Sequence, residues 1–179
     1  VSICIVTLNA SEFLYKCLSS IDEQPGLSWI GSPANSADGN QAAGIERLDY
    51  EVIVVDNGST DGTLAMLEQD FPAAQIIRND TNLGYAHPCN QAMQVSQGGF
   101  LLLLNPDTVL QEGALQRMLN YLVAWPQVGA VGPRILNPAV NAGGTTDCPF
   151  VLQRRWGSIY FYRRLPCWIY LWFEKILIW

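Results

Sequence analysis

Short apolar runs alternate with stretches of helical periodicity along most of the chain. The apolar runs cover residues 1–7, 50–56, 75–78, 100–104 and 128–133. Between them, apolar residues recur at three- and four-residue spacing, as in amphipathic helices, over residues 11–24, 60–71, 88–97 and 110–125. Unbroken apolar strands that alternate with helices are typical of a parallel sheet covered on both faces. The pattern therefore predicts an α/β fold around a mainly parallel sheet flanked by helices.

Two segments depart from this alternation and suggest how the chain is organised. Residues 25–48 are rich in Gly, Ser, Ala and Asn without an apolar period, which predicts a long polar surface loop. Residues 151–179 mix arginines with four of the six tryptophans and have no apolar run long enough to span a bilayer. We therefore predict one domain over residues 1–150, followed by a basic aromatic tail that begins a further part of the protein.

Charge separates these two parts of the chain. Residues 1–150 carry five Lys and Arg against fifteen Asp and Glu, whereas residues 151–179 carry five against one. The acidic domain lacks the basic face that nucleic-acid binding requires, so no nucleic-acid partner is expected. The tail suits peripheral contact with an anionic membrane surface. The alternative is that its aromatic residues belong to a core completed by residues after 179.

The five cysteines are scattered, without the paired spacing of a zinc cluster or a disulfide framework. Buried thiols in a reducing compartment are the simpler interpretation. The sequence does not open with a basic segment leading into an apolar core and a cleavage site. These features predict a cytoplasmic protein, with the tail placing it at the inner face of the cell membrane.

Polar clusters follow three of the predicted strands, at the sheet edge where α/β proteins bind ligands. Thr7 and Asn9 end the first strand, although Asn9 can equally cap a helix. Asp56 ends the second, within Asp-Asn-Gly-Ser-Thr-Asp-Gly. A turn and a cap account for the glycines and hydroxyls of this run, but not for a carboxylate that ends a fully apolar strand. Asp56 is therefore a candidate acceptor for a base N–H or ribose hydroxyls.

The strand over residues 100–104 delivers a second carboxylate to the same edge, in Asn105-Pro-Asp107-Thr108. Asp107 can hold Mg²⁺ or Mn²⁺, with the remaining oxygens supplied by a diphosphate and water. The ion would stabilise charge on a leaving diphosphate. Asn-Pro-Asp is also common turn chemistry, so this motif alone leaves both interpretations open.

Residues 78–92 connect these clusters and contain His87, the only histidine, which suits a solvent-facing loop better than a catalytic role. Gly84 permits close backbone approach, and the following helix start can favour a phosphate. Dinucleotide-binding and P-loop motifs do not occur in the sequence. A nucleophile elbow around a serine is also missing, which argues against Ser–His–Asp hydrolysis.

Together and in this order, these motifs resemble glycosyltransferase family 2, the inverting enzymes with a GT-A fold and a Rossmann-like nucleotide-binding sheet. The stretches that carry the resemblance are residues 1–8, 50–62, 82–86, 103–108 and 131–138. The variants Asp-Asn-Gly-Ser, Asn-Leu-Gly-Tyr-Ala and Asn-Pro-Asp-Thr look most like the rhamnosyltransferase-like branch. The resemblance implies a dTDP- or UDP-sugar donor, with dTDP-rhamnose as one candidate, and transfer of the sugar to a glycan or lipid-linked acceptor.

The resemblance also implies roles for individual residues. Asp56 would contact a pyrimidine base, and Asn105, which replaces the first acid of the family's D-x-D motif, would donate a neutral hydrogen bond. Asp107, the second acid, would hold Mg²⁺ or Mn²⁺. The complete expected substrate-binding set is Thr7, Asn9, Asp56, Asn57, Arg78, Asn82, Gly84 and Asn105.

The family's general base lies on a later carboxylate, which we expect beyond Trp179, so no catalytic residue is assigned within the chain. A truncated, non-catalytic relic that at most binds nucleotide is the alternative. A sugar-nucleotide pyrophosphorylase is less favoured, because the Gly-rich basic phosphate loop expected after the first strand is absent from residues 8–12.

Overall fold

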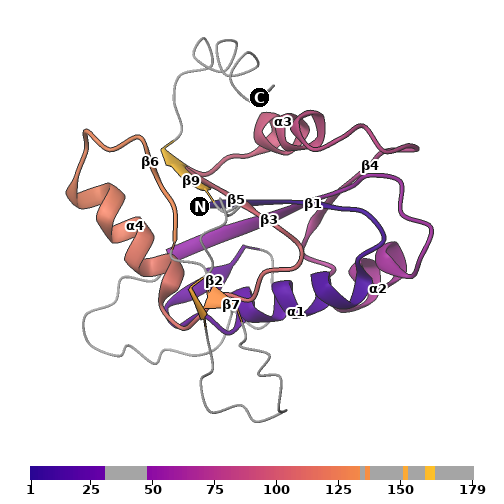
Figure 1. The fold of residues 1–179 in the computed structure, drawn as a ribbon, viewed down its shortest axis with the longest axis horizontal. Helices are drawn as coiled ribbons and strands as arrows, with labels where there is room; N and C mark the ends of the chain where they lie inside the picture. Colours follow the sequence, from indigo (N-terminus) through magenta and orange to yellow (C-terminus); the bar gives the residue numbers. More distant parts are fainter. Residues whose placement is uncertain (31–47, 134–135, 138–150, 153–159, 164–179) are drawn as a thin grey trace.

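The computed structural model describes residues 1–30, 48–133, 136–137, 151–152 and 160–163. Four helices lie among the strands, in the alternation that the apolar pattern predicts (Figure 1). The helices are α1 (Ser11–Asp22), α2 (Thr63–Asp70), α3 (Ala86–Val95) and α4 (Ala114–Ala124). The strands are β1 (Ser2–Thr7), β2 (Leu27–Trp29), β3 (Leu48–Asp56), β4 (Gln75–Arg78), β5 (Phe100–Leu104), β6 (Ala130–Val131), β7 (Leu136–Asn137), β8 (Val151–Leu152) and β9 (Tyr160–Arg163).

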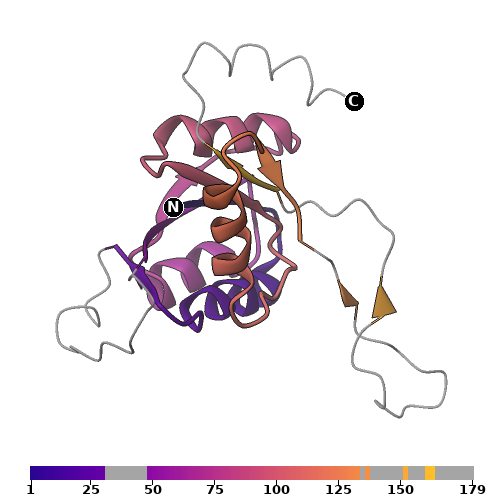
Figure 2. The same cartoon turned by 90° about the vertical axis from the view of Figure 1, so that its left-hand side faces the viewer.

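The main sheet has the strand order β2-β3-β1-β5-β9-β6, and β4 also pairs with β3. All pairs among β1 to β5 are parallel, whereas β9 runs antiparallel to both β5 and β6. This confirms the predicted α/β class with a mainly parallel sheet. Strands β7 and β8 pair with each other and not with this sheet (Figure 2).

Two strands of the sheet arise where the sequence analysis expected none. The polar segment over residues 25–48 contributes β2, which pairs with the first three residues of β3, while β4 pairs with its last four. Strand β9 lies within residues 151–179, assigned above to the tail, and inserts between β5 and β6. Strands of three or four residues are too short for hydrophobic periodicity to distinguish them from loops. Their formation is decided by pairing with neighbouring strands.

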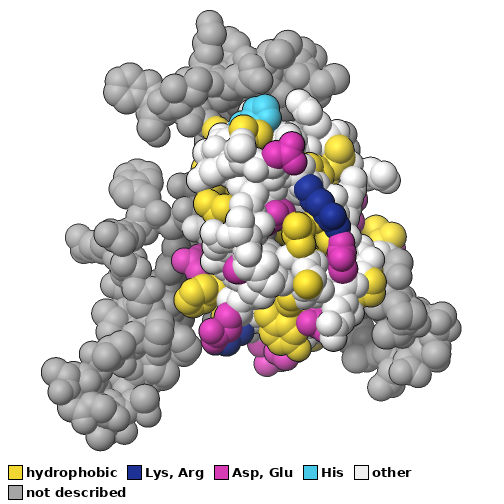
Figure 3. Space-filling model, turned by 90° about the vertical axis from the view of Figure 1, so that its right-hand side faces the viewer, with side chains coloured by type: hydrophobic (Ala, Val, Ile, Leu, Met, Phe, Trp, Pro, Cys, Tyr) yellow, Lys and Arg dark blue, Asp and Glu magenta, His cyan; other side chains and the backbone are white. Residues whose placement is uncertain are grey.

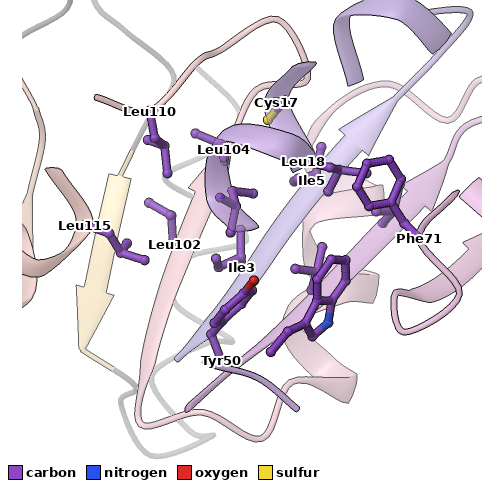
Figure 4. Packing of buried hydrophobic residues seen from close by; sticks show 14 of the residues in the cluster. Ile3, Ile5, Cys17, Leu18, Tyr50, Phe71, Leu102, Leu104, Leu110 and Leu115 are labelled. Carbon is purple, nitrogen blue, oxygen red and sulfur yellow. The ribbon is translucent and has the colours of Figure 1, made fainter. Parts of the chain in front are cut away.

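The helices cover the two faces of the sheet unequally. Alternate strand residues, such as Ile3, Val54 and Leu102, point to the face covered by α1, α2 and α4, where the larger core cluster lies (Figure 4). The intervening residues, such as Cys4, Val55 and Leu103, face α3. Of the four described helices, Figure 1 shows only α3 on this side of the sheet. The sheet is therefore the middle of three layers, with its main core on the α1 side.

The three cysteines in the described residues, Cys4, Cys17 and Cys89, are buried and free, as the sequence analysis expected. Burial is the main cause that raises the pKa of the Cys4 and Cys17 thiols to about 12 and that of Cys89 to about 11. They are therefore neutral packing residues at physiological pH.

Among the described residues, no helix is both long and apolar enough to cross a membrane. Most of the predicted polar loop and most of the tail lie outside these residues. The expected membrane contact and location at the inner face of the cell membrane therefore stay predictions.

At the amino ends of the strands, a glycine permits a close contact that ties β1, β3 and the start of β5 together. The Gly98 N–H donates to Ser2 Oγ at 2.7 Å and to Glu51 Oε1 at 3.2 Å. Ser2 Oγ in turn donates to Glu51 Oε1 at 2.6 Å. A Cβ atom at Gly98 would lie 2.6 Å from the Ser2 backbone nitrogen, so only glycine fits here.

We expect Gly98→Ala to lower the free energy of unfolding by about 1–3 kcal/mol, because the added methyl group forces backbone apart in a packed site. Gly99→Ala is the matched control, since a Cβ there meets nothing within 4 Å. Urea unfolding of both variants measures the difference. Equal midpoints for the two variants would contradict the close contact.

Candidate nucleotide-binding site

The register of three parallel strands places predicted site residues side by side at the carboxyl edge of the sheet. Thr7 at the end of β1 pairs with Asp56 at the end of β3, and Asp56 pairs with Arg78 at the end of β4. Each of the three continues an alternating set that faces α1 and α2. The strand-end pattern predicts Thr7 and Asp56 at one edge, and Arg78 belongs to the expected substrate-binding set; the structure brings all three together there.

Thr7 and Asp56 are the most unusual residues of this edge, because both are polar and only 1% exposed. Asp56 Oδ2 accepts a hydrogen bond from the Ser59 N–H at 3.1 Å. Its Oδ1 atom and Thr7 Oγ1 have no hydrogen-bond partner within the described part of the chain. An unpaired buried polar group costs about 1–3 kcal/mol, so two in register are unfavourable unless a ligand satisfies them.

Hydrogen bonds join the loop after β1 to the loop after β3. The Asn9 N–H donates to Ser59 Oγ at 2.9 Å, and the Thr60 N–H donates to Asn9 Oδ1 at 2.8 Å. Asn9 has a φ of 49°, a left-handed conformation that asparagine tolerates better than most residues. Neither Asn9 nor Ser59 caps a helix. The cap proposed for Asn9 is wrong, because its side chain is used between the loops.

Asp61 meets the amino ends of two helices at once. Its Oδ2 accepts from the Ser11 N–H at 3.3 Å at the start of α1, and its Oδ1 accepts from the Thr63 N–H at 2.9 Å at the start of α2. The Thr63 hydroxyl also donates to Oδ1. This last bond is the largest cause that lowers the pKa of Asp61 below its ordinary 3.8. An anion at two helix amino ends is favoured by their exposed N–H groups and dipoles.

Asn57 binds the segment that contains Asn82 and Gly84. Asn57 Nδ2 donates to Asn82 Oδ1 at 2.7 Å and to the Gly84 carbonyl at 2.9 Å. Asn57 Oδ1 accepts from the Leu83 N–H at 3.1 Å and from Asn79 Nδ2 at 3.2 Å. Three of the predicted site residues therefore form one connected unit, whereas Asn79 was not predicted.

Gly58 lets the two loops approach each other closely. It has a φ of +92°, and a Cβ there would lie 3.2 Å from the backbone of Thr81. Glycine adopts this φ without the steric cost that other residues meet. The turn after β3 can therefore pack directly on the segment after β4.

Arg78 forms an ion pair with Glu68 of α2, and both side chains are more than half exposed. Exposed pairs of this kind contribute about 0–1 kcal/mol. Arg78 therefore remains available for another anion at little cost in free energy.

Helix α1 supports the loop that carries Asn105 and Asp107. Cys17 Sγ donates to the Asn105 carbonyl at 3.6 Å, and the Leu110 N–H donates to Ser20 Oγ at 3.0 Å. Burial of the thiol is the largest cause of the raised pKa of Cys17, and the charge of the nearby Asp107 carboxylate is the second. Asn105 is half-buried and Asp107 is exposed. Because β5 pairs with β1, this loop lies at the same edge as Thr7.

Comparison with known proteins places this edge in context. The family model of glycosyl transferase family 2 matches residues 2–166. The chain belongs to this family. The resemblance found in the sequence motifs is thereby confirmed, and the match includes the residues of β9.

Relatives of this family 2 chain include bacterial glycosyltransferases. The N-acetylglucosaminyl-diphospho-decaprenol L-rhamnosyltransferase of Mycobacterium tuberculosis is 31% identical over 98 residues, which are 49% of this chain and 32% of that protein. A PGL/p-HBAD biosynthesis glycosyltransferase of Mycobacterium bovis is 29% identical over 171 residues, which are 91% and 59%. The chain thus spans only part of the length of these relatives.

Solved structures show the same fold. The mannosyltransferase PcManGT from Pyrobaculum calidifontis, in complex with GDP-Man and Mn²⁺, has a TM-score of 0.61 at 21% identity, covering 91% of this chain and 44% of that one. Residues 1–349 of TarS from S. aureus have a TM-score of 0.56 at 20% identity, covering 90% and 46%. These neighbours are GT-A glycosyltransferases, so the predicted GT-A fold is confirmed.

A divalent ion fits the loop after β5 as a site with one protein carboxylate. Within the described residues, no group of three or more His, Cys, Asp or Glu residues surrounds a potential ion. Mg²⁺ commonly takes one or two carboxylates and completes its shell with phosphate oxygens and water. The exposed Asp107 suits that arrangement.

The charge of the surrounding face also favours a cation. Figure 3 views the molecule from the side where the strands end, and acidic side chains are spread over it while basic ones are fewer. A diphosphate would meet repulsion on this face unless a bound ion offset the charge. His87 is exposed at the start of α3, in agreement with a solvent-facing position.

The hydrogen-bond network at this edge contains two residues, Asn79 and Gln91, that the sequence motifs did not indicate. Asn79 and Gln91 exchange two hydrogen bonds, from Asn79 Nδ2 to Gln91 Oε1 at 2.9 Å and from Gln91 Nε2 to Asn79 Oδ1 at 3.0 Å. No sequence signal separates Gln91 from the neighbouring amides Asn90 and Gln94. The contact becomes visible only once α3 packs beside the end of β4.

We expect Asp61→Ala to lower the free energy of unfolding by about 1 kcal/mol, because N–H groups of two helices lose their acceptor. The folded pKa is depressed, so this contribution is present above 3.8 and is lost as pH falls through the lower folded value. Urea unfolding between pH 3 and 7 measures both effects. Asp80→Ala, at an exposed position that heads no helix, is the control, and an equal loss in both variants would rule out the double cap.

Proposed function

We propose that the chain is the donor-binding part of an inverting glycosyltransferase that binds a nucleotide-diphosphate sugar. The observation that carries this proposal is the pair of buried oxygen atoms, Thr7 Oγ1 and Asp56 Oδ1, which lie at neighbouring strand ends and have no hydrogen-bond partner among the residues that the structure describes. Membership of glycosyl transferase family 2 supports it independently. A ligand with matching polar groups would satisfy both atoms on binding.

A pyrimidine base of the uracil or thymine type matches this pair. Its N3–H can donate to the carboxylate of Asp56, and an adjacent carbonyl can accept from the hydroxyl of Thr7. A hydrogen bond that involves a charged group contributes about 1.5–3 kcal/mol, which suffices for strong discrimination between bases. The donor is therefore a UDP- or dTDP-sugar. The residues that line the base on the loop side include Asn9.

The diphosphate would lie toward the loop after β5. Asp107 would hold Mg²⁺ or Mn²⁺ there, and the ion, when bound, would stabilise negative charge on the leaving diphosphate. Asn105 would donate a neutral hydrogen bond to ribose or phosphate. Arg78 can exchange its exposed partner Glu68 for the nucleotide, because their pairing contributes little.

The donor sugar would face the segment with Asn82 and Gly84. dTDP-rhamnose is the first donor to test, because a rhamnosyltransferase of Mycobacterium tuberculosis is among the relatives. An acceptor hydroxyl, on a glycan or a lipid-linked glycan, would attack the anomeric carbon opposite the leaving nucleotide. No residue of this chain is assigned the role of general base for that step. Nucleotide binding without transfer is the alternative outcome for the chain on its own.

We expect the protein to bind UDP and dTDP more tightly than CDP, because cytosine has no N3–H to donate to Asp56. Asp56→Asn should weaken UDP binding by about tenfold or more and reduce the preference over CDP, since the new amide can donate to cytosine N3. Titration calorimetry with each nucleotide measures both effects. An unchanged preference in the variant would show that Asp56 does not read the base.

The metal part of the proposal has a separate test. UDP binding should strengthen when Mn²⁺ is added, and Asp107→Ala should abolish that increase while metal-free binding stays similar. Glu112→Ala, an exposed acidic position further along the same connection, is the matched control. If Asp107→Ala retains the full effect of Mn²⁺, the ion is held elsewhere.

A further inference from the structure

Asn57 was predicted to contact the donor, but its side chain is already saturated by the protein. The residue is 3% exposed. Its amide group donates two hydrogen bonds and accepts two, and all four partners lie within residues 79–84. An asparagine side chain offers two donor hydrogens and two acceptor lone pairs. No hydrogen-bonding capacity remains for a ligand.

The neighbouring amide, Asn79, forms a reciprocal hydrogen-bonded pair with Gln91. Asn79 must present its Nδ2 group to the Oδ1 atom of Asn57, since two oxygen atoms facing each other would repel. In this orientation Gln91 Oε1 accepts from Asn79 Nδ2 and Gln91 Nε2 donates to Asn79 Oδ1, so the pair with Gln91 holds the Asn79 side chain in place while its bond to Asn57 is kept. Gln91 is half-buried on α3 and reaches the sheet edge through Asn79, the residue after β4.

We propose that Gln91 is a positioning residue which, through Asn79 and Asn57, holds residues 82–84 against the end of β3 in the conformation that binds the donor. This inference rests on the proposed function, because it assigns the purpose of the held segment. It also changes the role of Asn57 from a ligand of the donor to a support of the segment. The donor contacts then belong to the exposed Asn82 and Gly84.

The hydrogen bonds that link Gln91, Asn79 and Asn57 depend on one another. Without Gln91, Asn79 can rotate and lose its bond to Asn57, and the Leu83 N–H then competes with water for Asn57 Oδ1. Residues 82–84 would become more mobile in the free protein and would have to be ordered when the donor binds. A ligand whose binding-competent state is less populated binds more weakly in proportion.

The decisive experiment compares Gln91→Leu with Gln94→Leu, an exposed glutamine on the same helix, in the full chain. We expect Gln91→Leu to weaken UDP binding in the presence of Mn²⁺ by about fivefold to twentyfold, and Gln94→Leu to leave it unchanged. Amide hydrogen exchange, followed by NMR, should be faster at Leu83 in Gln91→Leu. Exchange at Val54, in the centre of β3, should stay as in the wild type.

A double-mutant cycle with Asn79→Ala separates this role from a general loss of stability. If Gln91 acts through Asn79, the double variant should bind UDP no more weakly than Asn79→Ala alone. Additive losses, or wild-type affinity together with unchanged exchange at Leu83 in Gln91→Leu, would overturn the inference. If the wild type binds no nucleotide, the proposed function fails, and exchange at Leu83 still decides whether Gln91 holds the segment.

Discussion

The parallel pairing of β1 with β3 in one register is the constraint on which the rest of the site depends. It sets Thr7 beside Asp56 and directs both side chains to the α1 side of the sheet. A shift by one residue would turn both to the opposite face, together with every core residue of the strand. The large cluster under α1, α2 and α4 therefore stabilises the position of the polar pair as well as the fold.

The polar pair works against stability. Two buried oxygen atoms without a hydrogen-bond partner among the described residues are unfavourable for folding, yet the adjoining loops are closely bound to each other through Asn9, Ser59 and Asp61. The surrounding backbone is thus well determined while two side-chain atoms stay available. This combination is expected where binding, rather than stability, has selected the residues.

Amide side chains and a cation would serve different purposes at this edge. Neutral amides bind the segment after β4 to the end of β3 without adding charge near an anionic ligand. On a face that is largely acidic, the bound ion, rather than a cluster of basic residues, would offset the diphosphate charge (Figure 3). Arg78 is the exception, and its exposed pairing with Glu68 is weak enough to exchange.

The sequence by itself determined the α/β class, four helices and the edge that carries Thr7, Asp56 and Asp107, because period and strand-end position are local properties of the chain. It did not reveal β2 or β9, which are too short to have a period and form by pairing with β3, β5 and β6. Nor did it separate Gln91 from neighbouring amides. Only the tertiary structure decided that the Asn57 side chain has all its hydrogen bonds formed within the described residues, whereas those of Asp56 and Thr7 do not. The reason is that the hydrogen-bond partners of a side chain come from residues distant in the chain.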